Sequence, residues 1–392
     1  MKNFPAIARR VALIAALATT TMIAAEKKVP APKEFFVYFG TYTGPKSKGI
    51  YRSRLDVATG KLSPAEVAAE CSAPAFLAAH PTEKFLYAID EASDPATKPG
   101  RGLAAYSLDQ KTGGLVLLNE QTAGGSGPCH LTVDHDGKSV LVANYGGGSV
   151  AAVPLQPDGR LGALGTFIQH AGSSVNAARQ KGPHAHVIVV APDNRFALTA
   201  DLGLDKILVY RLDAAKATLA PNTPAFATVP PGSGPRHLAF HPGGKFVYVI
   251  SEMLCTMAVF RYDAARGELT DIQNISTLPP GETVKAGTST AEVVAHPGGK
   301  FLFGSNRGHN TIAVFAIDQK TGQLTHIENQ PTLGKTPRHF AVDPTGTWLL
   351  AENQDSDNVV VFRIDPQSGH LTPTGQSLAV PSPVCAIFVA AR

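Results

Sequence analysis

The chain has 392 residues and an almost balanced charge, with 35 Lys and Arg against 31 Asp and Glu. It contains no run or stripe of like charge, which argues against a nucleic-acid-binding protein. The 37 Gly and 30 Pro residues recur at regular places, which is typical of turns rather than of disorder. A closed β architecture fits this composition and can exceed the usual length of one domain.

The N-terminal segment differs from the rest of the chain. Basic residues precede an apolar run at 11–18, and small residues follow it up to Ala25. This pattern predicts a secretory signal peptide over 1–25, and therefore an exported protein that is periplasmic or secreted. An uncleaved N-terminal anchor is the alternative. We expect a linker at 26–34, a single domain at 35–392, and no membrane span in the mature chain.

A motif of strand, turn and strand recurs along the chain. In one copy a short apolar run ends at His241, Pro242 and two glycines supply the turn, and 246–250 is rich in β-branched and aromatic residues. Four strands in each period of roughly fifty residues indicate one blade of a β-propeller. The turn residues of the six whole copies are Pro81, His135, Pro192, Pro242, Pro297 and Pro344.

A seventh copy is divided between the two ends of the domain. Residues 35–42 and 50–56 resemble the second and third strands of a copy, and 383–389 resembles a first strand. The C-terminal strand is therefore expected to join the N-terminal blade, which closes the ring and leaves no open sheet edge. The predicted fold is all-β: a seven-bladed β-propeller with four-stranded antiparallel blades.

Two positions of each hairpin should meet at one rim of the central channel, because they are equally far from the turn along its two strands. The residues six before the turn residue are Ala75, Cys129, His186, Arg236, Ala291 and Arg338. The residues ten after it are Glu91, Tyr145, Leu202, Glu252, Arg307 and Gln354. A purely structural repeat would not need so many charged and imidazole groups, so this rim is a candidate site.

Structural roles are the alternatives for several of these residues. Arg236 and Glu252 could form a structural ion pair. Residues five and six before the turn are expected to face opposite sides of the sheet. Bonding to a neighbouring blade is therefore an equal alternative for the five-before residues His130, His237 and His339. Histidines beside the turns at the opposite end are expected to be structural, namely His80, His241 and His296.

Metal binding and disulfide bonding receive little support from the sequence. His184 and His186 are two apart on a strand and share a face, but no third ligand can be placed beside them, so no metal site is predicted. An even number of cysteines permits disulfides in an exported chain, and buried free thiols are at least equally expected. The cysteines are Cys71, Cys129, Cys255 and Cys385.

Four short stretches resemble one known family. They are 36–43 (FVYFGTYT), 234–237 together with 251–252, 305–307 (SNR) and 336–338 (TPR). With them the chain resembles the propeller-type lactonases over essentially the whole predicted mature chain. That family includes bacterial 6-phosphogluconolactonases and fungal carboxy-cis,cis-muconate lactonizing enzymes. The resemblance implies a catalytic set at the channel mouth, formed here by His186, Arg236, Glu252 and Arg307.

The implied chemistry suits these residue types. Opening a lactone requires a base that deprotonates water and cations that stabilise the developing oxyanion. His186 or Glu252 is the candidate base, with Glu252 favoured as the residue that assists His186. Arg236 and Arg307 are candidates for holding the oxyanion or an anionic substrate group. Further substrate contacts are expected from His130, His237, Arg338 and His339.

The expected partner is a small-molecule sugar lactone, with no metal, no organic cofactor and no nucleic acid. Because 6-phosphogluconolactone is made in the cytoplasm, the substrate of an exported enzyme stays open. An exported propeller that binds a ligand or protein without catalysis is one alternative, and a muconate-type cycloisomerase is another. For a lactonase, Glu252→Gln or His186→Ala is expected to abolish turnover and leave the thermal melt nearly unchanged.

Overall fold

The computed structural model describes residues 1, 2, 32–97 and 99–392. Pro32–Arg392 forms one compact unit, which contains every strand discussed below. The predicted signal peptide and most of the predicted linker lie outside the described residues. The first strand begins at Glu34, the last residue of that linker. None of the helices described is long and apolar enough to span a membrane.

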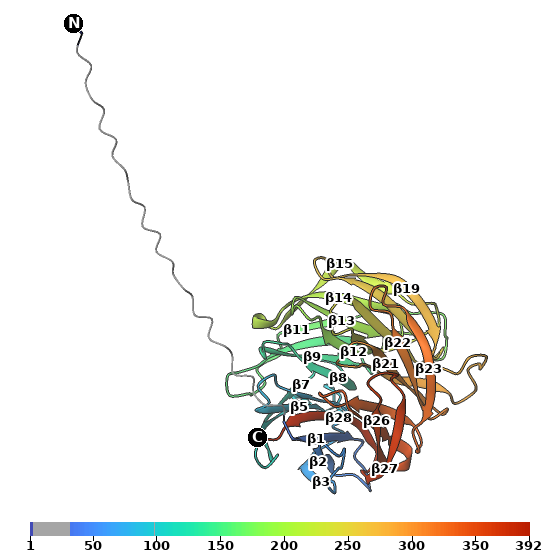
Figure 1. Cartoon of the computed structure of the whole chain (residues 1–392). Helices are drawn as coiled ribbons and strands as arrows, with labels where there is room; N and C mark the ends of the chain where they lie inside the picture. The colour runs from blue at the N-terminus through green and yellow to red at the C-terminus, as the bar shows by residue number, and fades with distance from the viewer. Residues whose placement is uncertain (3–31, 98) are drawn as a thin grey trace. The chain divides into compact units, whose positions relative to one another are not determined.

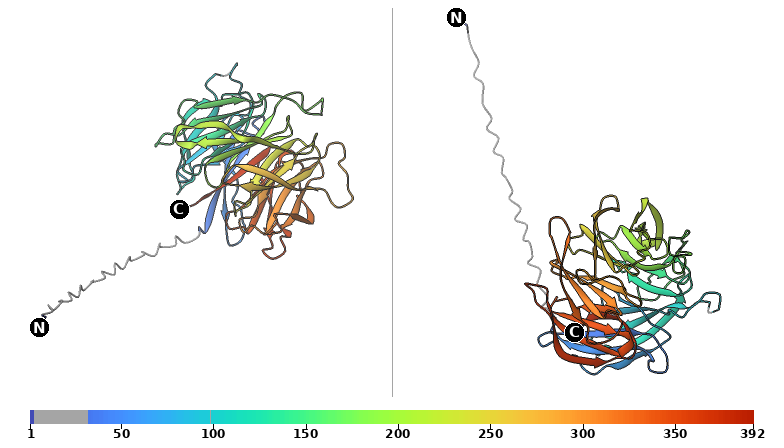
Figure 2. Two further views of the ribbon diagram at one scale, coloured as in Figure 1. Left: turned by 90° about the horizontal axis from the view of Figure 1, so that it is seen from above. Right: turned by 90° about the vertical axis from the view of Figure 1, so that its right-hand side faces the viewer.

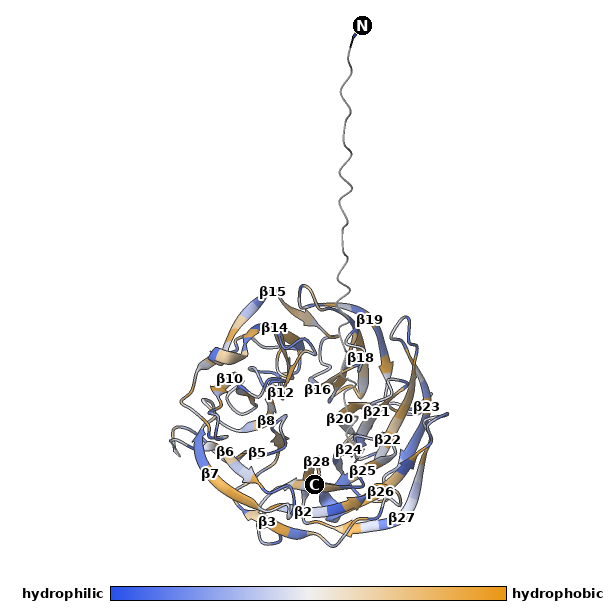
Figure 3. Ribbon diagram, turned by 60° about the vertical axis from the view of Figure 1, so that its left-hand side comes forward, coloured by the Kyte–Doolittle hydropathy of each residue, from blue (hydrophilic) through white to orange (hydrophobic). Residues whose placement is uncertain are grey.

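Within this unit, 28 strands form seven four-stranded antiparallel sheets arranged around a centre, which confirms the predicted propeller (Figures 1 and 3). The first sheet contains β28 (Pro383–Ala390), β1 (Glu34–Thr41), β2 (Gly49–Asp56) and β3 (Glu66–Glu70). The second contains β4 (Leu77–Ala79), β5 (Phe85–Ile89), β6 (Gly102–Leu108) and β7 (Leu115–Thr122). The third contains β8 (Pro128–Val133), β9 (Ser139–Asn144), β10 (Ser149–Pro154) and β11 (Thr166–Gln169).

The remaining four sheets repeat the same order from the channel outwards. They are β12 (Ala185–Val190), β13 (Phe196–Asp201), β14 (Lys206–Asp213) and β15 (Thr218–Thr228); β16 (Pro235–Phe240), β17 (Phe246–Ser251), β18 (Thr256–Asp263) and β19 (Glu268–Ser276); β20 (Ser289–Ala295), β21 (Phe301–Arg307), β22 (Thr311–Ile317) and β23 (Leu324–Pro331); and β24 (Pro337–Val342), β25 (Trp348–Asn353), β26 (Asn358–Ile364) and β27 (Leu371–Ala379). Two short 3-10 helices, η1 (Ala214–Lys216) and η2 (Gln354–Ser356), follow strands β14 and β25.

The core lies between neighbouring blades. The second strand of a blade is buried along its whole length, as in β17, whereas the outermost strand β19 is half-exposed. Leu198 of one blade packs in the same apolar cluster as Val247 and Phe260 of the next. A continuous run of β-branched and aromatic residues suits a strand that is covered on both faces, and its burial is the main favourable term in folding.

The histidines beside the turns tie each blade to the next one. His80, His241 and His296 each place Nε2 2.9–3.1 Å from the carbonyl oxygen of a glycine in the following turn. That glycine requires a positive φ, which is +72° at Gly299, the partner of His241. The structural role predicted for these histidines is confirmed.

The ring closes through the two ends of the domain. β28 pairs with β1 from Phe35↔Ala390 to Thr41↔Pro383 and forms the innermost strand of the first sheet. Figure 2 shows the red C-terminal strand beside the blue N-terminal one. The closure predicted from the divided seventh copy is therefore confirmed, and the two edges that an open array would expose are paired.

A β-bulge interrupts the innermost strand of six blades at the same place. In β16, Pro235 pairs with Ser251 and His237 with Ile250, so Arg236 has no partner in the ladder. The corresponding unpaired residues are Cys129, His186, Arg338, Val384 and the pair Ala291 and Glu292. A bulge redirects the side chain that it carries. These residues stand at the rim that the sequence repeat had marked.

Candidate active site

Seven of the twelve marked rim residues line one open cavity where the inner strands converge, and Arg236 lines the adjoining cavity described below. The cavity has a volume of about 280 Å³ and is lined by Glu91, Cys129, Tyr145, Arg179, His186, Glu252, Arg307 and Arg338. Bulges on the innermost strands supply Cys129, His186 and Arg338. The ends of the second strands supply Glu91, Tyr145, Glu252 and Arg307. The two sets of positions inferred from the hairpin geometry are thus brought together.

Glu252 joins three arginines. Its Oε1 lies 2.8 Å from Arg179 Nη2. Its Oε2 lies 2.9 Å from Arg307 Nη2 and 3.2 Å from Arg236 Nε. Burial alone would raise the pKa of Glu252, but the three guanidinium groups lower it to about 2. Glu252 is therefore an anion at neutral pH, and both of its oxygens are engaged in holding the arginines.

The arginines are also fixed by the backbone. Arg236 Nη1 donates to Ala291 O and Arg307 Nη2 donates to Thr290 O, each at 2.8 Å. Burial, together with Arg338 and Arg307, lowers the pKa of Arg236 to about 10, so this side chain stays charged at neutral pH. Arg307 Nε has no hydrogen-bond partner among the described residues, whereas Arg236 Nε lies beside Glu252 Oε2 without a well-aligned hydrogen bond. Rigid, charged and partly unsatisfied donors suit the binding of an oxyanion.

His186 is a neutral imidazole in the wall of the cavity. Its Nδ1 lies 3.8 Å from Cys129 Sγ, and the rings of Tyr145 and His237 stand edge-on to it at 5.3 and 5.1 Å. Burial, followed by the charge of Arg236, lowers its pKa well below 6.5. Within the described residues no carboxylate bonds to His186. Among these residues, no hydrogen bond joins His186 to Glu252, so no contact supports the expected assistance of His186 by Glu252.

On the opposite wall, Glu91 is held by a tyrosine and faces an arginine. Tyr42 Oη donates to Glu91 Oε1 at 3.1 Å, and Arg338 Cζ lies 5.3 Å from the centre of the Tyr42 ring. Burial raises the pKa of Glu91, and Arg338 and the bond from Tyr42 oppose only part of this effect. Glu91 and Glu252 occupy the same position of the repeat, so the sequence marked Glu91 as a rim residue but assigned it no chemical role.

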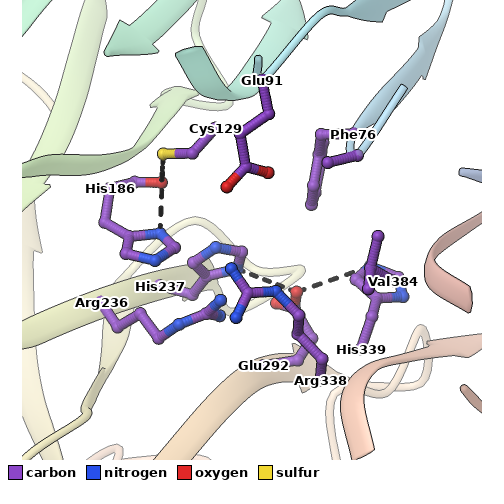
Figure 4. Close-up of a pocket in the computed structure, with 11 residues that line it drawn as sticks. Phe76, Glu91, Cys129, His186, Arg236, His237, Glu292, Arg338, His339 and Val384 are labelled. Atoms are coloured by element: carbon purple, nitrogen blue, oxygen red, sulfur yellow. Dashed lines mark hydrogen bonds and ion pairs between the residues drawn. The ribbon is translucent and has the colours of Figure 1, made fainter. Parts of the chain in front are cut away.

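A second, deeper cavity adjoins the first and shares Glu91, Cys129, His186 and Arg338 with it (Figure 4). Its free space of about 10 Å³ has room for one water molecule and not for a lactone. Arg236, His237 and His339 line it together, so consecutive residues face the same channel. The bulge explains why the expectation that five-before and six-before residues face opposite sides was wrong.

Buried contacts between histidines and carboxylates form the floor of this deeper cavity. His237 Nδ1 lies 2.8 Å from Glu292 Oε2, and His339 Nε2 lies 3.5 Å from the same oxygen. His339 Nδ1 lies 2.8 Å from Glu352 Oε2. Burial would lower the pKa of His339, but the two carboxylates raise it, whereas burial lowers the pKa of His237 to about 4. These contacts between blades favour a supporting role for both histidines over the substrate contact that we expected.

His130 is placed apart from both cavities. Its ring centre lies 4.2 Å from that of Phe76, and its Nδ1 accepts a hydrogen bond from the backbone N–H of Ile188 at 3.4 Å. Ile188 belongs to the neighbouring blade. The bond to a neighbouring blade, which the sequence had offered as the alternative, is the one observed.

Arg179 was missed by the sequence analysis. It stands in the connection between β11 and β12, outside the repeating hairpin, so no position of the repeat marked it. The backbone beside it is anchored by Gln180, whose Nε2 donates to Leu202 O at 2.8 Å. Arg179 also donates to Tyr145 Oη at 3.2 Å, and its side chain is 44 % exposed. It is the outermost of the cations around Glu252.

The cavity wall carries an excess of positive charge. Arg179, Arg307 and Arg338 line it, against the two carboxylates of Glu91 and Glu252. All four cysteines are free, with Cys71 less buried than the rest, so of the two alternatives left open by the sequence the free thiols are observed. Over the described part of the chain, no group of three or more His, Cys, Asp or Glu side chains is arranged to hold a metal ion. The groups available for chemistry are guanidiniums, carboxylates and a neutral imidazole.

Known proteins share this fold and much of this sequence. A 6-phosphogluconolactonase of Bacillus subtilis is 36% identical over 356 residues, which cover 91% of this chain and 99% of that protein. The solved structure of a periplasmic gluconolactonase of Pseudomonas aeruginosa has a TM-score of 0.84 at 34% identity, and the match covers 92% of this chain and 100% of that chain. A candidate 6-phosphogluconolactonase of Bacteroides fragilis has a TM-score of 0.85 at 34% identity, with coverages of 93% and 100%. Residues 36–388 match the family described as "Lactonase, 7-bladed beta-propeller".

Proposed function

Because this chain belongs to the seven-bladed β-propeller lactonase family, we propose that it hydrolyses the ring ester of a sugar lactone, as a 6-phosphogluconolactonase does. The observation that carries this proposal is the set of arginines held on Glu252 beside a neutral His186. Arg179, Arg307 and His186 line one cavity with Glu252, and Arg236 lines the adjoining one. Attack of water on a lactone carbonyl places negative charge on the carbonyl oxygen. Arg236 and Arg307 offer fixed donors for that charge.

The roles that we assign follow from these contacts. Arg236 and Arg307 stabilise the oxyanion, and Glu252 fixes their positions rather than acting as a base, because three guanidiniums occupy both of its oxygens and lower its pKa, which makes it a weak proton acceptor. His186 lines the same cavity as a neutral imidazole that can orient the attacking water. Arg338 is close enough to the cavity to bind a substrate oxygen.

The cavity favours a small and anionic or oxygen-rich substrate. Its volume of about 280 Å³ is near the lower end of the range for ligand pockets, which suits a single sugar ring. Arg179 and Arg338 add positive charge beyond what the oxyanion requires. A carboxylate or phosphate on the lactone would meet these guanidiniums as charge-assisted bonds.

A panel of lactones tests this function. The purified protein is mixed with glucono-δ-lactone, 6-phosphogluconolactone and muconolactone, and proton release is followed against the uncatalysed rate. We expect turnover of an aldonolactone, with the phosphorylated compound giving the lower KM. Saturable binding without turnover would instead support a binding propeller, and conversion of muconolactone alone would support the cycloisomerase.

We also propose that the chain is exported. The support is the pattern of residues 1–25 and the periplasmic location stated for the similar Pseudomonas aeruginosa protein. Cell fractionation of the full chain and of a form that begins at residue 26 tests this. The full chain should reach the periplasm or the medium and the shorter form should stay inside; equal retention of both would contradict export.

A further inference from the structure

Glu91 is the carboxylate of the cavity that is left available for chemistry. It follows β5, and Figure 4 shows its carboxylate directed into the space between Cys129, His186 and Phe76. It lines both cavities. Its Oε1 accepts the hydroxyl of Tyr42, while no bond to Oε2 and no ion pair within 4 Å is found among the described residues. One of its oxygens therefore faces the cavity without a partner.

We propose that Glu91 is the general base that takes the proton from the attacking water, with Tyr42 as the residue that positions it. This inference rests on the proposed lactone hydrolysis and concerns the same cavity. Glu252 is excluded from this task by its three guanidinium partners. His186 is disfavoured because burial, and then Arg236, His237 and Arg338, oppose its protonation. Glu91 has no guanidinium partner within 4 Å among the described residues, and its pKa is raised by burial although Arg338 and Arg236 act against this.

The surroundings of Glu91 suit a base that works near neutral pH. A carboxyl group in water is mostly too weak a base, and burial raises the pKa of Glu91. The charged and titratable groups that face it are Tyr42, Arg338, Arg236, Cys129 and His186. Arg338 and Arg236 keep the ionised form accessible, since both are cations. Burial thus raises the pKa of Glu91, and the two arginines limit that rise.

The proposed step balances without any added reagent. The water oxygen forms a bond to the acyl carbon as its proton passes to Glu91 Oε2, and the carbonyl oxygen becomes an oxyanion facing Arg236 and Arg307. The tetrahedral intermediate then breaks the bond between the acyl carbon and the ring oxygen. Glu91 returns its proton to that ring oxygen, which becomes a hydroxyl. The product carboxylic acid ionises and releases one proton to solvent.

The first test replaces Glu91 by Gln and uses Glu120→Gln as the matched control, since Glu120 lies on the outer strand β7 of the same blade. We expect Glu91→Gln to lower kcat at least about a hundredfold with KM within about threefold, and Glu120→Gln to leave both unchanged. In the wild type, kcat should fall on the acid side with an inflection above the usual glutamate range. That acid limb should be absent from the residual rate of Glu91→Gln.

The second test is chemical rescue. Formate added to Glu91→Ala should restore part of kcat, whereas formate added to His186→Ala should not. Tyr42→Phe keeps the ring beneath Arg338 but removes the bond to Glu91, and it should move the acid limb to higher pH. This shift would not arise if Tyr42 only supported the fold.

The outcomes separate the two proposals. An active wild type whose Glu91→Gln variant keeps kcat within threefold, or keeps the acid limb, would overturn the role of Glu91 alone. Loss of the limb in His186→Asn, with its retention in Glu91→Gln, would assign the base to the imidazole. A folded wild type that opens no lactone in the panel would overturn both the base and the lactonase function.

Discussion

Glu252 shows how one side chain can be both electrostatic anchor and structural support. It is 8 % exposed and compensates the charges of three arginines that would otherwise repel one another. Removing one partner from such a buried cluster leaves uncompensated charge, which is more costly than losing a surface ion pair. From the sequence, Glu252→Gln was expected to leave the thermal melt nearly unchanged, whereas these contacts favour a loss of stability.

Glu252→Gln is therefore expected to lower both activity and stability. With the carboxylate gone, Arg236 and Arg307 are no longer held, and kcat/KM should fall by at least about a hundredfold. The free energy of unfolding should decrease by about 3 kcal/mol at pH 7, since a buried charge cluster loses its only anion. Denaturant unfolding measures this; an unchanged midpoint would show that solvent screens the arginines.

The pH dependence of that loss provides its control. The pKa of Glu252 is about 2 in the folded protein, below its ordinary value of 4.5. A lowered folded-state pKa gives stability that is complete above pH 4.5 and disappears as the pH falls from 4.5 to 2. The stability difference between wild type and Glu252→Gln should shrink over this interval. A difference that is constant from pH 6 to pH 2.5 would contradict the ionised role of Glu252.

Most candidate residues could be found from the sequence because the repeat fixes their depth in the hairpin. Arg236 and Glu252 are equally far from the turn, and they meet at 3.2 Å. Counting residues does not reveal a bulge, so the shared orientation of Arg236 and His237 was not foreseen. Arg179 could not be found this way at all, because its loop has no counterpart in the other blades.

At the scale of the strand, the same hairpin serves two tasks at its two ends. The turn end carries His241, whose Nδ1 accepts from Gly243 N at 2.9 Å and whose Nε2 lies 3.0 Å from Gly299 O. The open end carries the cavity residues. Because β17, which runs from the turn end to the open end, is buried and paired throughout, a change at the turn should not reach the cavity.

His241→Ala is expected to weaken the contact between two blades and leave catalysis intact. Loss of both hydrogen bonds and of the edge-on contact with Phe246 should lower the free energy of unfolding by about 2 kcal/mol. The values of kcat and KM should stay within about twofold. His370→Ala is the control, because His370 is 53 % exposed and its replacement should cost less than about 0.5 kcal/mol. A large change in kcat would disprove the separation of the two ends.

The bulges were the element that sequence reasoning could not supply. The apolar run before each turn predicts a strand, but a ladder that skips one residue depends on pairing across strands, which no single strand encodes. The signal was present indirectly, because the residues six before the turn are chemically unlike the rest of their strands. Arg236 directly precedes His237 and an apolar run that ends at Phe240.

For the whole molecule, stability depends on joining the two ends of the domain. β28 buries Val384, Cys385 and Val389 against its own and the neighbouring blade. It also supplies every ladder partner on the inner side of β1. Without it, β1 would become an exposed edge facing the channel, and such edges promote association.

Deletion of 383–392 is therefore expected to abolish folding rather than to trim a terminus. The shortened protein should accumulate as insoluble material or give soluble aggregates on size-exclusion chromatography. Deletion of 391–392 alone is the control and should leave a folded protein, because β28 ends at Ala390. A monomeric, cooperatively unfolding product from the longer deletion would show that six blades and an incomplete seventh suffice.

The fold itself was predictable in full from the sequence, whereas its inner geometry was not. Strand number, blade number and the divided blade follow from periodicity, since each copy repeats turn and strand residues at fixed places. The sizes of the cavities and the identity of the free carboxylate depend on how side chains from different blades fill a shared space. Glu91 and Glu252 hold equivalent positions in the repeat and meet opposite surroundings, which only the assembled ring determines.

On six of the seven inner strands, the residue that the ladder skips is a position that can be exchanged. Since its side chain takes no part in the ladder, evolution or design can replace it without disturbing strand register. Val384 places an unreactive side chain at one of these bulges, and Ala291 lies in another. New specificities could therefore arise in this scaffold by single substitutions at these positions, each made independently in a different one of the six blades.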